Sequence, residues 1–226
     1  MNTILLEEKY ILEYIRDTIQ SSKTGQITVN KARYHHNTKY CDAPSVCHHG
    51  ILTMSDLKNI GIKDYNEDFF QRMDDIESHI NGISAVSLSV VGLHDLYDGE
   101  EEYNPFTPDQ VDFLVSSEIK AGRSAIHYGN EFLSQESISV DKLRSIDIRL
   151  LKLIEMIESG YLSDSYIIQN AIEKYNYLRE VALVMKSNQL DIPLREMSHH
   201  QNYSLDINKL SSNPKLVLKQ RKNINI

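Results

Sequence analysis

The chain has 226 residues, of which 41% are hydrophobic and 25% are charged. These proportions are typical of a soluble globular protein and exclude a disordered or collagen-like chain. The 24 basic and 32 acidic residues give a net charge of −8, which argues against non-specific binding of nucleic acid or membrane surfaces by the chain as a whole.

The start of the chain and its cysteine content predict a cytoplasmic protein. Glu7 and Glu8 interrupt the apolar stretch that a secretion signal needs. No apolar run approaches the ~20 residues of a membrane-spanning helix. Two cysteines in a chain of this length form no disulfide scaffold, as is usual in a reducing compartment. We therefore expect no membrane partner.

Residues 1–22 are predicted to form an amphipathic helix that precedes the main domain. Five apolar residues repeat at nearly helical spacing, namely Ile4, Ile11, Leu12, Ile15 and Ile19. Ser21, Ser22 and Gly25 then favour an end to the helix.

Residues 23–145 are predicted to form an α+β domain, because short apolar runs alternate irregularly with turn signals. The segments with strand character are ITVNKARYHHNT, ISAVSLSVV, QVDFLVSS and AIHYGNEFLS. The segments APSVCHHGILTM and NEDFFQRMDDIESHI have helical character. No regular strand–helix repeat, glycine-rich dinucleotide motif or P-loop is present, which argues against a Rossmann fold.

Two further regions are predicted after this domain. Residues 146–195 have the pattern of a helical extension, with one apolar stripe formed by Ala171, Ile172, Tyr175, Leu178, Ala182 and Met185. That stripe suits either the core or a partner protein. Residues 196–226 are polar and basic, and we expect a solvated tail, with a basic arm that contacts nucleic acid or a partner as the alternative.

Histidines and cysteines gather between residues 33 and 52, which raises the question of a zinc site. Cys41, Cys47, His48 and His49 are possible ligands by residue type. However, adjacent side chains point apart on a regular element, and no pair has the usual ligand spacing. We therefore expect no metal, and small buried side chains for the cysteines.

The same segment has an ordered pattern. His36-Asn37-Thr38 lies on a predicted strand, followed by Pro44-Ser45 and then by Gly50-Ile51-Leu52. This order resembles the opening of the ADP-ribosyltransferase fold, where a strand with His-x-Thr leads into a helix. The segments 84–89 and 128–133 resemble the second strand and the glutamate-bearing last strand of that family, and the DarT-like toxins are the most similar members.

The resemblance implies a split β-sheet core and transfer of ADP-ribose from NAD, with NAD as a substrate. In it, Glu131 is the catalytic carboxylate, and it would stabilise the oxocarbenium-like ribose as nicotinamide leaves. His36 and Thr38 would bind the adenosine side or the ribose hydroxyls. The other implied contacts are Ser87 and Ser89 at the nicotinamide pocket, Tyr128 stacked on the ring, and Arg72 at the pyrophosphate.

The acceptor is expected to be a protein or a nucleic acid, in a toxin, a defence component or a translocated effector. Gly129 stands where arginine-modifying members carry Gln or Glu, which disfavours an arginine acceptor. The acidic segment 93–109 would repel a phosphate backbone if it flanks the site. The alternatives are an NAD hydrolase, an RNA 2′-phosphotransferase on the same fold, for which Arg72, Lys120 and Arg123 are the basic candidates, or a non-catalytic interaction module.

Overall fold

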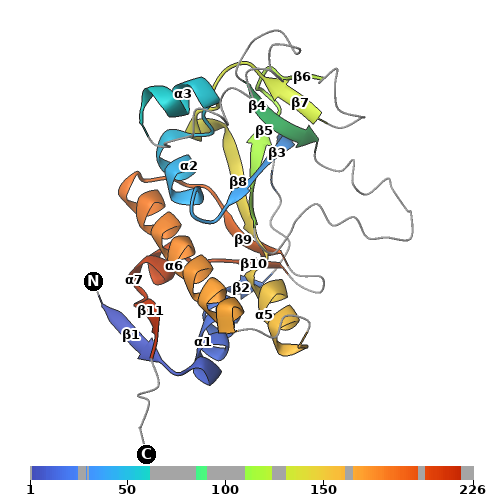
Figure 1. Ribbon diagram of the computed structural model, residues 1–226. Helices are drawn as coiled ribbons and strands as arrows, with labels where there is room; N and C mark the ends of the chain where they lie inside the picture. The colour runs from blue at the N-terminus through green and yellow to red at the C-terminus, as the bar shows by residue number, and fades with distance from the viewer. Residues whose placement is uncertain are drawn as a thin grey trace, which may run out of the picture.

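The computed structural model (Figure 1) describes residues 2–24, 29, 31–61, 85–90, 110–123, 131–160, 165–197 and 202–219. Within these residues, helices and strands are mixed along the chain without a regular repeat. This arrangement confirms the α+β class. The described part contains no helix long and apolar enough to cross a membrane.

The described strands form one large sheet and one small one. In spatial order, the large sheet contains β2 (Lys23–Thr24), β10 (Asn202–Ser204), β9 (Leu194–Met197), β8 (Leu143–Ile148), β5 (Gln110–Ser116), β3 (Ala32–Lys39), β4 (Val86–Val90), β7 (Glu131–Ser134) and β6 (Gly122–Arg123). All neighbours in it are antiparallel except β8 and β9. The small sheet pairs β1 (Thr3–Leu6) with β11 (Lys215–Leu218) in parallel.

The described helices differ widely in length. They are α1 (Glu8–Gln20), α2 (Ala43–His49), α3 (Met54–Asn59), α5 (Leu150–Glu158), α6 (Ser165–Ser187) and α7 (Ile207–Ser212), with a 3₁₀ turn at Val140–Lys142. In Figure 1, α2 and α6 lie side by side, next to the large sheet. The predicted strands in the segments of β3, β4, β5 and β7, and the predicted helices in those of α2, α5 and α6, are confirmed.

The two faces of the large sheet differ in polarity, because successive residues of a strand face opposite sides. One face is apolar, and it carries Val86, Leu88, Val111, Phe113, Ile146 and Leu194, which form one core with buried residues of α1, α2 and α6. The opposite face carries His35, Asp112, Asp147 and Arg195, all buried as well. The sheet therefore separates an apolar core from a layer of buried polar groups.

The first residues differ from the predicted single helix. The helix begins only at Glu8, and Ile4 belongs to β1, where it is level with Leu216 of β11. Within α1, Ile11, Ile15 and Ile19 are buried as their spacing predicts. The pairing of β1 depends on a strand more than two hundred residues away, and local periodicity contains no information about such a partner.

The C-terminal segment also differs from the solvated tail that its polarity predicts. Its described part, residues 202–219, forms β10, α7 and β11. Tyr203, Leu205, Leu210 and Leu216 are buried in the common core. Four apolar anchors spaced widely among polar residues give no periodic signal, which explains the discrepancy.

The apolar stripe of α6 is part of the core. Its six residues are at most 3% exposed. The stripe is therefore no exposed surface for a partner, which excludes that alternative for this face of the helix.

Candidate functional site

Three segments resemble the ADP-ribosyltransferases in sequence, and the strands that carry them are direct neighbours in the large sheet. β3 carries the histidine segment, β4 the serine segment and β7 begins at Glu131. β4 pairs with β3 on one side and with β7 on the other. Segments separated by about fifty residues of sequence thus lie within one hydrogen-bonded patch.

The register of this patch defines a row of three positions. Ser89 is opposite His35 on β3 and opposite Glu131 on β7. Residues that are opposite one another in antiparallel strands occupy the same face of the sheet. His35, Ser89 and Glu131 therefore hold positions in one row, and Ser87 lies two residues away on the same face of β4.

His36 and Thr38 occupy the other set of positions on β3. They alternate with His35 and Asn37, so they belong to the opposite face from Ser87 and Ser89. The His36 Nδ1 lies 2.9 Å from the carbonyl oxygen of Ser87, to which it can donate a hydrogen bond. The structure therefore places Ser89 opposite His35, with Ser87 on the same face of the sheet, whereas the sequence pattern had pointed to His36.

The remaining candidates are placed only in part. Arg72 and Tyr128 lie outside the described residues. Glu131 is described by its backbone register alone, as the first residue of β7. The predicted helix NEDFFQRMDDIESHI and the acidic segment 93–109 also lie outside the described part of the chain.

His35 is held by a carboxylate from the neighbouring strand. Its Nδ1 lies 3.3 Å from Oδ1 of Asp112 on β5, and both side chains are 3% exposed. Asp112 on β5 is opposite Asn37 on the neighbouring strand β3, so its contact with His35, two residues along β3, is diagonal. Burial raises the pKa of Asp112 to about 6, while the interaction with His35 acts in the opposite direction. The site thus contains a buried imidazole–carboxylate pair next to Ser89.

The polar layer continues beyond Asp112 into a second ion pair. Asp112 is opposite Asp147 on β8, and Asp147 is opposite Arg195 on β9. The Arg195 guanidinium binds both oxygens of Asp147, with an Nε–Oδ1 distance of 2.7 Å. A bidentate geometry of this kind partly offsets the cost of removing both charges from water. This pair fixes β8 against β9.

Glu196, the neighbour of Arg195, belongs to the other face and caps α5. Its two carboxylate oxygens accept hydrogen bonds from the backbone N–H groups of Leu150 and Leu151, at 3.0 and 2.9 Å. Complete burial raises the pKa of Glu196 to about 8, and these two N–H groups oppose that rise. The role of this carboxylate is structural, because it satisfies N–H groups at the start of a helix.

The cysteine–histidine segment holds no cluster of metal ligands in the described structure. No group of three histidine, cysteine or acidic side chains is suitably placed there. Cys47 is buried, as expected, while Cys41 is exposed. The His48 Nδ1 lies 3.0 Å from the amide nitrogen of Asn188, the residue that follows α6.

The sequence pattern did not point to the position of His35, Asn37 and Asp112 on the polar face of the large sheet, for a specific reason. Two adjacent histidines on a strand face opposite sides, and only the pairing of that strand shows which of them faces a given neighbour. A usable signal existed for Asp112, since it is the one charged residue in the apolar run QVDFLVSS. A carboxylate buried in such a strand requires a polar partner.

Comparisons of the chain with protein-family models, with curated proteins and with solved structures found no significant match.

Proposed function

We propose that this protein transfers ADP-ribose from NAD to a macromolecular acceptor, using a core like that of the ADP-ribosyltransferases. The observation that carries the proposal is the adjacency of β3, β4 and β7. The sequence resemblance rests on three separate segments, and a site shared by them requires that they meet in space. Their pairing in one patch, with Ser89 opposite both His35 and Glu131, meets that requirement.

The proposed reaction breaks the bond between the ribose C1′ and the nicotinamide nitrogen. Nicotinamide leaves with the bonding electron pair, and a nucleophilic oxygen or nitrogen of the acceptor forms the new bond to C1′ and releases its proton. The ribose becomes oxocarbenium-like between these two events. A fixed carboxylate at the position of Glu131 would stabilise that positive charge, and a strand holds such a group more firmly than a loop.

Within this proposal, His35 replaces His36 as the strand histidine that binds NAD. His35 shares its register row with Ser89 and Glu131, whereas His36 belongs to the other face of β3. Asn37 then takes the place that the resemblance gave to Thr38. The carboxylate of Asp112 holds the Nδ1 edge of His35, which fixes the orientation of the ring.

The test is a measurement of nicotinamide release from NAD by the purified protein, alone and with added protein or nucleic acid fractions. The proposal predicts release that increases with one acceptor fraction, together with radiolabel from the adenylate of NAD in that fraction. NAD should also raise the melting temperature, because a ligand of the folded state stabilises it. Release without an acceptor would indicate an NAD hydrolase. If the protein shows no nicotinamide release and no thermal shift with NAD, the proposal is refuted.

A further inference from the structure

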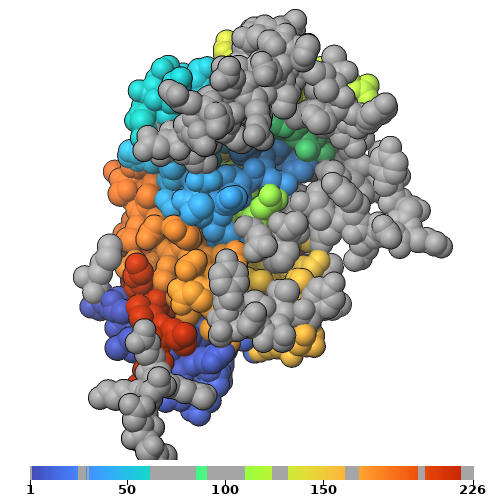
Figure 2. All heavy atoms as spheres, viewed as in Figure 1, coloured from blue at the N-terminus to red at the C-terminus, as the bar shows by residue number. Residues whose placement is uncertain are grey.

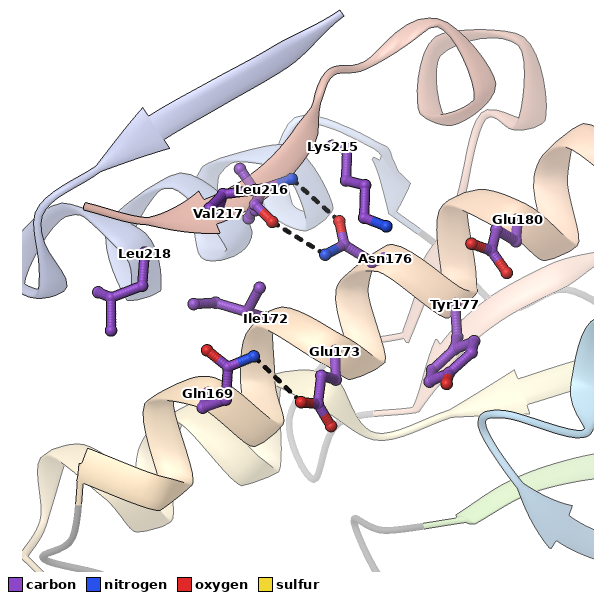
Figure 3. Close-up of a pocket in the computed structure, with 10 residues that line it drawn as sticks. All are labelled: Gln169, Ile172, Glu173, Asn176, Tyr177, Glu180, Lys215, Leu216, Val217 and Leu218. Atoms are coloured by element: carbon purple, nitrogen blue, oxygen red, sulfur yellow. Dashed lines mark hydrogen bonds between the residues drawn. The ribbon is translucent and has the colours of Figure 1, made fainter. Parts of the chain in front are cut away.

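A groove runs between helix α6 and strand β11, away from the proposed NAD site. Its volume is about 440 Å³, which lies within the range of sites that hold small ligands or short peptide segments. Figure 3 shows its walls, and Figure 2 shows α6 and the C-terminal strand at the surface. The lining residues are Gln169, Ile172, Glu173, Asn176, Tyr177 and Glu180 of α6, and Lys215–Leu218 of β11.

The strand wall of the groove is fixed by the side chain of Asn176, which makes the two backbone hydrogen bonds that a neighbouring strand would make. The amide of Asn176 donates to the carbonyl oxygen of Leu216 at 3.0 Å and accepts from its N–H at 2.9 Å (Figure 3). Lys215 and Lys219 donate their N–H groups to the opposite side, toward β1. Because backbone groups alternate along a strand, Leu218 presents its own pair on the same edge as Leu216. With Leu216 already bonded to Asn176, the backbone pair of Leu218 is the part of this edge that an extended peptide can use.

The helix wall carries acidic groups around an aromatic ring. Glu173, Tyr177 and Glu180 follow one another at the spacing of one helix face. Neither carboxylate has a cation within ion-pair distance among the described residues, and Glu173 accepts a hydrogen bond from the amide of Gln169. The pKa of Tyr177 is raised, chiefly by burial. Smaller contributions come from the nearby groups of Cys41, Glu180, Glu173 and Asp42.

The basic residues in this part of α6 are directed elsewhere. Lys174 is buried and donates to Asn170, and Arg179 is buried and donates to the carbonyl oxygen of Asn213. Lys215 is the only cation among the ten lining residues, and it comes from the strand wall. The helix wall therefore presents negative charge on both sides of a tyrosine ring.

We propose that this groove docks an extended segment of a partner protein, with an arginine side chain of that segment stacked on Tyr177 between Glu173 and Glu180. A planar guanidinium can stack on an aromatic ring while it donates hydrogen bonds to carboxylates at its edges. The half-buried side chain of Leu218 suits the aliphatic part of such a segment. The backbone edge at Leu218 can pair with its main chain.

The test compares three pools of short fluorescent peptides with random flanks and a fixed central residue, which is arginine, lysine or glutamine. The immobilised full-length protein should retain the arginine pool most strongly and the glutamine pool least. For the tightest peptide, Glu173→Gln combined with Glu180→Gln should weaken binding about tenfold, and Tyr177→Leu by a similar factor. Lys215→Gln should strengthen binding, since it removes a competing positive charge.

The matched control combines Glu13→Gln with Asp17→Asn on the exposed side of α1, which makes the same charge change outside the groove. This control should bind as tightly as the unaltered protein, and every variant is first checked for an unchanged melting temperature. Equal retention of the three pools would overturn the proposal, as would equal weakening by the control variant. The result is independent of NAD chemistry, so it stands or falls separately from the proposed function.

Discussion

His35 and His36 are adjacent in the sequence, yet strand geometry gives them different neighbours. His35 is buried against Asp112 and is level with Ser89, while His36 lies against the backbone of Ser87. Spacing along the chain predicts a histidine on this strand, but it assigns no face. The assignment depends on the partner strands β4 and β5, which lie far away in the sequence.

Replacement of each histidine by glutamine therefore separates the two. We expect His35→Gln to lower the rate of nicotinamide release at least about tenfold, because loss of one positioned hydrogen bond to a charged group costs about 1.5–3 kcal/mol. His36→Gln should change the rate by less than about twofold. The measurement is the initial rate at saturating NAD for both variants. A larger loss for His36→Gln would show that the other face of β3 binds the dinucleotide.

Asp112 adds a pH dependence to the stability. Its pKa rises from 3.8 to about 6 on folding, so between these values the folded protein holds a proton that the unfolded chain has released. The free energy of unfolding therefore falls as pH rises from 4 to 6, by about 2 kcal/mol from this group.

The variant Asp112→Asn, which stays neutral, should show a shallower decline over the same range. Urea unfolding of both proteins at pH 4, 5, 6 and 7 measures the two slopes, and contributions from Glu196 are common to both. If the free energy of unfolding declines equally with pH in both proteins, Asp112 is ionised over the same pH range in the folded state as in the unfolded chain.

At the scale of the elements, Gly50 shows how closely the end of α2 approaches the rest of the domain. Its φ of +86° lies in the region that glycine favours. A Cβ there would lie 2.1 Å from the carbonyl oxygen of Ile138. The next residue, Ile51, exchanges two backbone hydrogen bonds with Ile138, at 2.8 and 2.7 Å. The close approach therefore joins α2 to the segment after β7.

We expect Gly50→Ala to lower the free energy of unfolding by about 3 kcal/mol or more, since it adds backbone strain and a clash with main-chain atoms. Gly160→Ala is the matched control, because Gly160 has a φ of +73° and open space around its Cβ position. That change should cost only about 1 kcal/mol. Chemical denaturation measures both values, and equal losses would show that the clash at Ile138 is relieved.

The elements themselves were largely predictable where their signal is local. The β-branched and aromatic runs of β3, β4 and β5 and the 3.6-residue periodicity of α6 identify these elements correctly. β1 and β11 were not found, because each is short and is stabilised by pairing with the other end of the chain. Short edge strands of this kind have no sequence period long enough to detect.

At the scale of the whole molecule, the C-terminal segment completes the fold. It supplies β10 to the large sheet, β11 to the small sheet and four buried apolar side chains to the core. Asn213 also donates from its amide to the Tyr175 hydroxyl, at 3.2 Å. The polar composition of residues 196–226 predicted a tail, because composition averages over a few widely spaced anchors.

Deletion of residues 198–226 should therefore lower the melting temperature by more than about 10 °C, since each buried side chain contributes about 1.5–3 kcal/mol. Deletion of residues 220–226 alone removes none of these side chains and serves as the control. Circular dichroism during heating measures both proteins. An unchanged melting temperature for the longer deletion would show that the segment is an appendage.

The most direct test of the proposed site is the transfer of labelled ADP-ribose by three proteins: the unaltered chain, Glu131→Gln and Glu136→Gln. Glu136 is an exposed acid five residues further along and serves as the control for the loss of one negative charge. A site built on the row of His35, Ser89 and Glu131 predicts transfer by the unaltered chain, a loss of about a hundredfold or more in Glu131→Gln, and a rate within about twofold in Glu136→Gln. Equal rates for all three proteins, or no transfer by the unaltered chain, would contradict it.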